Sequence, residues 1–62
     1  MNTTVEFKND AGQVEATVTI DVDYEANKTH FKMTMEPEFY EEGKPSMTQS
    51  FAIRLIRSLQ DE

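Results

Sequence analysis

Hydrophobic and polar residues alternate along the first two thirds of the chain. From Val14 to Tyr24 every even position is apolar, and the odd positions carry threonines and carboxylates. Successive side chains of a strand point to opposite faces of a sheet, so this period of two predicts a strand with one buried face. Shorter runs on either side alternate in the same way. We therefore predict strands over about residues 3–8, 13–24 and 30–40.

The segments between these runs are typical of short turns. Asn9 to Gly12 joins the first two runs, and its glycine can adopt a positive φ. Glu25 to Thr29 joins the second and third, and contains Asn27, which tolerates the left-handed region. Short connections favour an antiparallel meander of order 1-2-3. Pro37 lacks an N–H group, which predicts that the third strand lies at an edge.

A helix is predicted after the sheet. Ser46 lies three residues before Gln49, the spacing of a capping box, so the helix should span about residues 46–60. Its apolar positions fall on one half of the helical wheel and are expected to cover the inner sheet face. These positions are Met47, Phe51, Ala52, Leu55, Ile56 and Leu59. The predicted fold is α+β, with residues 1–62 forming one βββα domain.

Composition narrows the classes of function. The chain has 62 residues, no cysteine, and twelve acidic against six basic side chains, for a formal charge of −6. This charge opposes direct binding to nucleic acid or to an anionic membrane. The apolar runs are too short for a membrane span or a secretion signal, so we expect a cytoplasmic protein.

The residues offer little catalytic or metal-binding chemistry. The single histidine, His30, has no recognisable nucleophile beside it, and we expect no catalytic residue and no cofactor. Asp21, Asp23 and Glu25 have the spacing that opens a calcium-binding EF-hand loop. The sixth position of that loop is Ala26 instead of glycine and the twelfth is Lys32 instead of glutamate. We therefore predict no metal site.

The outward face of the sheet is the main candidate for a binding surface. If Tyr24 lies opposite Phe31, Asp23 lies beside Lys32, Asp21 beside Thr34, and Glu36 and Glu38 lie beside Thr19 and Thr17. Two neighbouring rows of carboxylates would result. The candidate partner-binding residues are Asp21, Asp23, Glu25, Glu36, Glu38, Tyr40, Glu41 and Glu42.

Three interpretations of these surfaces remain open. The first is a non-enzymatic regulator or inhibitor that docks its acidic face on a basic protein, such as a nucleic-acid-binding protein, by imitating a phosphate backbone. Small acidic inhibitors from phages and mobile elements work in this way as a class. The second is that the charge only keeps a small domain soluble. The third is a homodimer that uses the third strand's edge or a helix surface formed by Ile53, Arg57 and Gln49.

Overall fold

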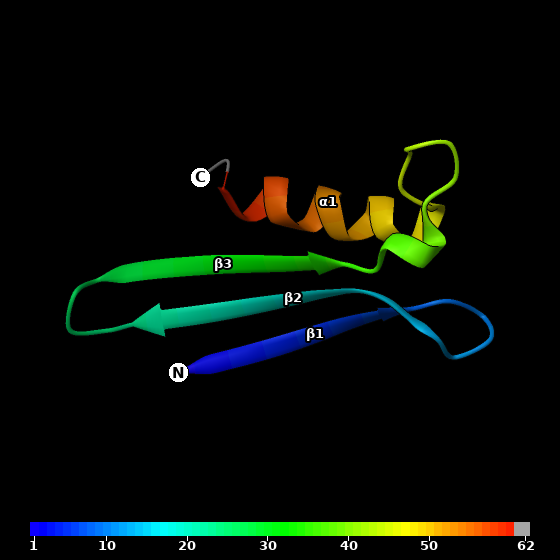
Figure 1. Cartoon of the computed structure of the whole chain (residues 1–62). Coiled ribbons are helices and arrows are strands. Elements are labelled where there is room, and N and C mark those ends of the chain that lie inside the picture. The colour runs from blue at the N-terminus through cyan, green and yellow to red at the C-terminus, as the bar shows by residue number, and fades with distance from the viewer. Residues whose placement is uncertain (61–62) are drawn as a thin grey trace.

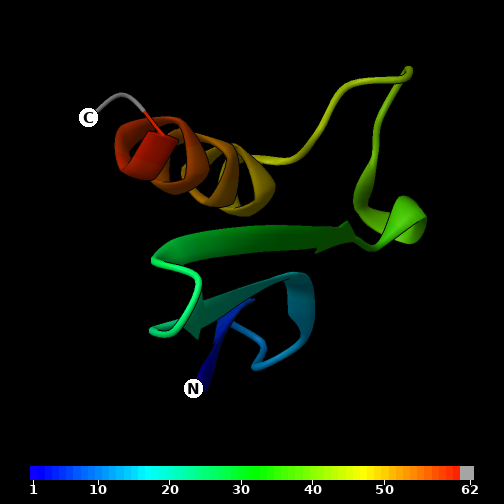
Figure 2. The ribbon, with the colours of Figure 1, turned by 90° about the vertical axis from the view of Figure 1, so that its left-hand side faces the viewer.

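The computed structural model describes residues 1–60, which form a three-stranded antiparallel sheet followed by one long helix (Figure 1). The strands are β1 (Asn2–Lys8), β2 (Val14–Asp23) and β3 (Lys28–Met35), and β2 is central. A short 3-10 helix, η1 (Pro37–Phe39), precedes α1 (Met47–Gln60). The helix lies along one side of the sheet (Figure 2). The predicted βββα architecture is confirmed.

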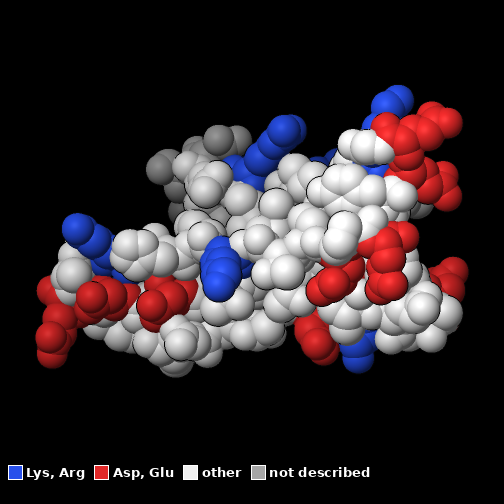
Figure 3. Space-filling model, viewed as in Figure 1, with Lys and Arg blue, Asp and Glu red and all other residues white. Residues whose placement is uncertain are grey.

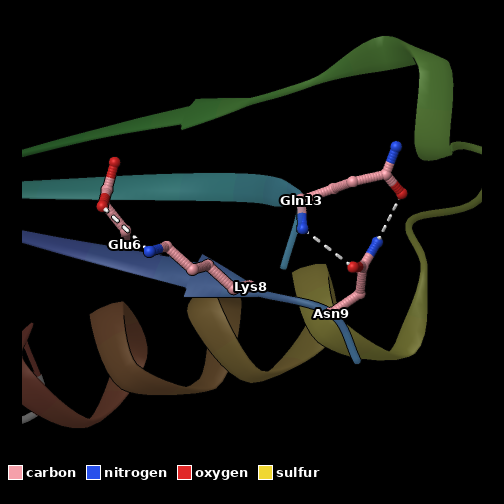
Figure 4. A network of polar contacts seen from close by, with 4 residues as sticks. All are labelled: Glu6, Lys8, Asn9 and Gln13. Atoms are coloured by element: carbon pink, nitrogen blue, oxygen red, sulfur yellow. Dashed lines mark hydrogen bonds and ion pairs between the residues drawn. The ribbon is translucent and has the colours of Figure 1, made fainter. Parts of the chain in front are cut away.

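The β1–β2 turn forms as predicted. Gly12 has a φ of 81°, and its N–H donates to the carbonyl of Asn9. The Asn9 side-chain oxygen accepts from the N–H group of Gln13 at 3.0 Å, and the Asn9 amide nitrogen donates to Gln13 Oε1 at 3.1 Å (Figure 4). The same oxygen also accepts from the N–H group of Ala11 at 3.0 Å. These bonds hold the turn without help from the rest of the chain.

A β-bulge interrupts the alternation of β2 just after this turn. Phe7 pairs with Ala16 whereas Lys8 pairs with Val14, so Glu15 is the extra residue. A bulge redirects the side chains of its strand. Glu15 is only 5% exposed, and the Ser46 hydroxyl, at the start of α1, donates to its carboxylate. The prediction that Glu15 belongs to the polar, solvent-facing set is therefore wrong.

The predicted pairing of β2 with β3 is also wrong. Phe31 pairs with Ile20 and not with Tyr24, a shift of four residues along β2. The chain reverses over residues 24–27, where Asn27 adopts the expected left-handed conformation with a φ of 53°. An even shift leaves every side chain on its original face, so the hydrophobic pattern does not distinguish the two registers.

The limits of β3 also differ from the prediction. The strand begins at Lys28 and ends at Met35, whereas we predicted residues 30–40. Pro37 begins η1 and does not lie in the strand. Glu36 and Glu38 therefore have no strand partner on the outer face.

The core lies between α1 and the inner sheet face and is small. Ala16, Val18 and Ala52 are fully buried, and partly buried apolar side chains pack against them. These are Phe7, Ile20, Met35 and Ile56. No helix within residues 1–60 is long and apolar enough to cross a membrane.

The rotation of α1 about its axis differs from the prediction. Gln49 and Ala52 are its buried residues, whereas Met47 is 78% and Phe51 52% exposed. Ile53 is half-buried, although we placed it on the solvent side. Only part of the predicted apolar stripe therefore faces the sheet.

Candidate interaction surfaces

A buried polar network fixes the N-terminal end of α1. The predicted capping box is present: the Ser46 N–H donates to Gln49 Oε1 at 3.0 Å, and the Gln49 N–H donates to Ser46 Oγ at 3.1 Å. The Gln49 amide nitrogen also donates to the carbonyls of Glu15, at 3.0 Å, and Glu36, at 2.8 Å. One side chain thus ties the helix to β2 and to the end of β3.

This network is structural in character. Gln49 is fully buried, and a buried amide is tolerated only where its hydrogen bonds are made. Within residues 1–60, no buried side-chain nitrogen or oxygen lacks a partner. Turning α1 so that Phe51 faced the sheet would break the bonds of Gln49. The network therefore explains why the helix presents large apolar residues to solvent.

The outer sheet face does not carry two rows of carboxylates. Asp23 pairs with Lys28 and Asp21 with His30, while Lys32 lies opposite Thr19. A row of basic side chains on β3 thus runs beside the acidic row on β2. The candidate residues Asp21 and Asp23 share a face, but Glu36 and Glu38 do not join them there.

The remaining acidic candidates lie mostly in the connection between β3 and α1. Glu38, Glu41 and Glu42 are exposed there, and Glu25 is exposed in the β2–β3 turn. Glu41 and Lys44 close a tight turn with backbone bonds of 3.0 and 2.9 Å. In the view of Figure 3, acidic side chains gather toward both ends of the molecule, and the charged side chains between them are mainly basic.

A shallow hollow lies beside this connection. It is lined by both acidic and apolar side chains of the segment that leads into α1. Its lining residues are Phe39, Glu41, Glu42, Lys44, Pro45, Ser46 and Met47. Tyr40, another candidate, is 39% exposed. Together these residues give one end of the molecule an acidic rim with aromatic and apolar groups in it.

The largest apolar feature of the surface runs along α1. Met47, Phe51, Leu55 and Leu59 recur every four residues, so they form one row on the helix, which we call the α1 ridge. Met47 and Phe51 are mainly exposed, Leu59 is 36% exposed and Leu55 is half-buried. The guanidinium carbon of Arg54 lies 6.0 Å from the centre of the Phe51 ring. We assigned these apolar residues to the core, and the hydrogen bonds of Gln49 to the carbonyls of Glu15 and Glu36 are what turn them away from it.

The helix residues that we predicted as an alternative interface are only partly exposed. Gln49 is buried in the polar network, Ile53 is half-buried and Arg57 is exposed. The other alternative, the edge of β3, pairs with no further strand within the described chain. Its outward side chains Lys28, His30 and Lys32 are basic or titratable.

The described residues contain no cluster of three or more His, Cys, Asp or Glu side chains that could hold a metal ion. His30 is exposed and lies across from Asp21 on the outer face. Comparison of the chain with protein-family models, curated proteins and solved structures found no match.

Proposed function

We propose that this chain is a non-enzymatic, cytoplasmic protein-interaction module that binds its partner through the α1 ridge. The observation that carries the proposal is the exposure of Met47 and Phe51 on a helix whose buried side is occupied by Gln49 and Ala52. Large apolar side chains in one exposed row commonly mark a protein-binding surface.

The ridge can supply substantial binding energy. Burying a large apolar side chain contributes about 1.5 to 3 kcal/mol, in proportion to the area that leaves water. Phe51 also has the Arg54 guanidinium near its ring, and aromatic and arginine side chains dominate the energetics of interfaces. Phe51 is therefore the residue whose removal should weaken binding most.

Affinity capture from a lysate of the native host tests this proposal. The wild-type chain is compared with Phe51→Ser, and with Tyr24→Ser as a matched control, because Tyr24 is an exposed aromatic residue in the β2–β3 turn. We expect Phe51→Ser to lose the captured protein and Tyr24→Ser to retain it. Equal capture by all three chains would contradict the proposal.

A second candidate function uses the acidic end of the molecule. Glu38, Glu41 and Glu42 are exposed and lie within two residues of the exposed Tyr40 in the sequence, a set that complements a basic surface on a partner protein. The chain would then act as a regulator or inhibitor, and a nucleic-acid-binding protein would be a suitable target. This mode differs from the one we derived from the sequence, in which the acidic sheet face makes the contact.

The effect of salt on partner binding distinguishes the α1 ridge from the acidic end as the binding surface. Screening weakens contacts between exposed charges and leaves apolar contacts largely unaffected. Replacement of all three glutamates by glutamine, together with high salt, should release a partner held by the acidic end. A partner held by the α1 ridge should remain bound under both conditions.

A further inference from the structure

We propose that the edge of β3 binds an extended segment of another protein, in which acidic and apolar residues alternate, and adds it to the sheet as a further strand. This edge is distinct from the α1 ridge and from the acidic end of the molecule. The inference therefore goes beyond the proposed function and does not rest on it.

The backbone of β3 carries hydrogen-bonding groups that point away from the sheet. Just beyond the end of β3, the Glu36 N–H donates to the carbonyl of Glu15 at 3.1 Å. Hydrogen-bonded and non-bonded pairs alternate along an antiparallel ladder, so in the observed register the even positions of β3 bond to β2. The odd positions direct their N–H and carbonyl groups toward the edge. They are Thr29, Phe31, Met33 and Met35.

The pairing on the other side of β2 supports this assignment. The Val22 N–H donates to the carbonyl of Met1 at 2.9 Å, so the even positions of β2 bond toward β1 and the odd positions are left for β3. Within residues 1–60, β3 has no strand on its other side (Figure 1). The helix does not take this place, because Ala52 packs on the sheet face against Ala16 and Val18. The edge groups can therefore pair with an added strand.

The strand β3 is suited to continuous pairing. It has eight residues, and its register with β2 runs without interruption from Lys28 to Met35. Proline and β-bulges commonly limit the pairing of an edge strand, and β3 contains neither, since Pro37 lies beyond its end. An added strand can therefore pair along the whole of this edge.

The outer face of the edge selects acidic residues. Lys28, His30 and Lys32 recur there at every second position, and all three are exposed. Within the described residues, none of them makes an ion pair. Opposite charges on neighbouring strands stabilise their pairing, and like charges destabilise it. Acidic residues at every second position of the added strand would thus stabilise it, whereas a second β3 would bring two basic rows together.

The overall charge of −6 does not prevent this contact. Neighbouring strands lie about 4.8 Å apart, so the added carboxylates would be one spacing from the basic row of β3. They would be two spacings, about 9.6 Å, from Asp21 and Asp23 on β2. At an ionic strength of about 0.15 M, exposed charges more than about 8 Å apart are largely screened. The attraction to the basic row therefore exceeds the repulsion from the acidic one.

The inner face of the edge selects apolar residues. Phe31 is half-buried and Met33 is 36% exposed, on the face that α1 covers. Residues that pair with them from an added strand would project onto the same face and cover them. The existing neighbour β2 has this alternating composition, with apolar Val18, Ile20 and Val22 between Thr19, Asp21 and Asp23. One side of β3 thus already pairs with the kind of segment that we propose for the other.

Hydrogen exchange followed by NMR tests the inference with a synthetic peptide that is about as long as β3 and alternates valine with aspartate. In the free chain, the N–H groups of Phe31 and Met33 should exchange at least about tenfold faster than those of His30 and Lys32, which bond to β2. Saturating peptide should slow exchange at Phe31 and Met33 at least about tenfold. A peptide that alternates valine with lysine is the control and should have no effect. Unchanged exchange with the aspartate peptide would overturn the inference.

Substitution of the two lysines tests the charge selection. Lys28→Gln combined with Lys32→Gln should raise the dissociation constant of the aspartate peptide about fivefold, because two opposite-charge pairs are lost. Lys44→Gln is the matched control, since it removes a charge from the exposed turn before α1 and should leave the constant unchanged. Circular dichroism checks that each variant keeps the fold. Equal affinity of the double variant and the wild type would contradict recognition by the basic row.

The same measurements separate other occupants and the proposed function. Exchange at Phe31 and Met33 that slows as the chain concentration rises, without peptide, would place a second copy at the edge and overturn the inference. Phe51→Ser should leave peptide binding unchanged, because the α1 ridge is a separate surface. If Phe51→Ser abolishes partner capture and the wild-type chain binds no aspartate peptide, the proposed function holds and only this inference fails.

Discussion

The two sides of α1 contrast in an unexpected way. The side that faces the sheet is centred on a polar residue, Gln49, and a small one, Ala52, whereas the solvent side presents Met47 and Phe51. The difference shows that hydrogen bonds and packing, and not hydrophobicity alone, set the rotation of this helix. The apolar residues displaced from the core by this rotation become the proposed binding surface.

The largest effect is expected at Gln49. Gln49→Ala removes three hydrogen bonds of a fully buried side chain, those to the carbonyls of Glu15 and Glu36 and to the Ser46 N–H, and each lost bond costs about 0.5 to 1.5 kcal/mol. We expect the free energy of unfolding to fall by about 3 kcal/mol, a large part of the stability of a domain this size. Urea unfolding measures the change.

Ser50→Ala is the matched control for this substitution. Ser50 lies one residue further along α1, and its hydroxyl bonds only to the Ser46 carbonyl, at 2.9 Å. Its loss should cost less than about 1 kcal/mol. Equal effects of the two substitutions would refute the role of Gln49 in holding the helix.

A smaller effect is expected at the start of the helix. Ser46→Ala removes the N-cap oxygen and the hydroxyl that donates to the buried Glu15 carboxylate. We expect a loss of about 2 kcal/mol in the free energy of unfolding, larger than for an exposed N-cap. Ser46→Thr keeps both bonds, and a similar loss in that variant would contradict this explanation.

The smallest effect on stability is expected on the solvent side of α1. Removal of a core phenylalanine costs about 3 to 5 kcal/mol, whereas Phe51→Ser should cost less than about 1 kcal/mol, because half of the side chain is already in water. Thermal unfolding in dilute solution measures the difference. A core-like loss would show that Phe51 packs on the sheet after all.

Much of the fold follows from local patterns in the sequence. The alternation in β1 and β2, the turn residues Gly12 and Asn27, and the Ser46–Gln49 capping box all predict what the structure contains. Each of these signals depends on a few neighbouring residues. That is why a single sequence is enough to read them.

The errors concern features that depend on distant contacts. A shift of four residues between β2 and β3 preserves both faces, so alternation could not reveal that Lys28 and His30 lie beside the acidic row. The bulge at Glu15 leaves no mark in the hydrophobic pattern. The acidic face was therefore overstated, and only Asp21 and Asp23 were correctly assigned to the outer surface of β2.

The rotation of α1 was missed for a related reason. An apolar stripe predicts the buried side of a helix only if no buried polar group competes for that side. Gln49 donates to the carbonyl of Glu36, 13 positions earlier in the sequence, and to that of Glu15, 34 positions earlier. Nothing in the local sequence indicates those two partners, so Phe51 was placed in the core and the α1 ridge was not recognised.

The rate at which single cysteines react with a thiol reagent tests the central claim most directly. In dilute solution, Met47→Cys should react at nearly the rate of an unfolded peptide, and Ala52→Cys at least about a hundredfold more slowly, because it is accessible only when the structure opens. Tyr24→Cys, at an exposed position of the β2–β3 turn, is the control and should react about as fast as Met47→Cys. Slow reaction of Met47→Cys, or fast reaction of Ala52→Cys, would contradict the account of a helix that buries Ala52 and leaves the α1 ridge exposed.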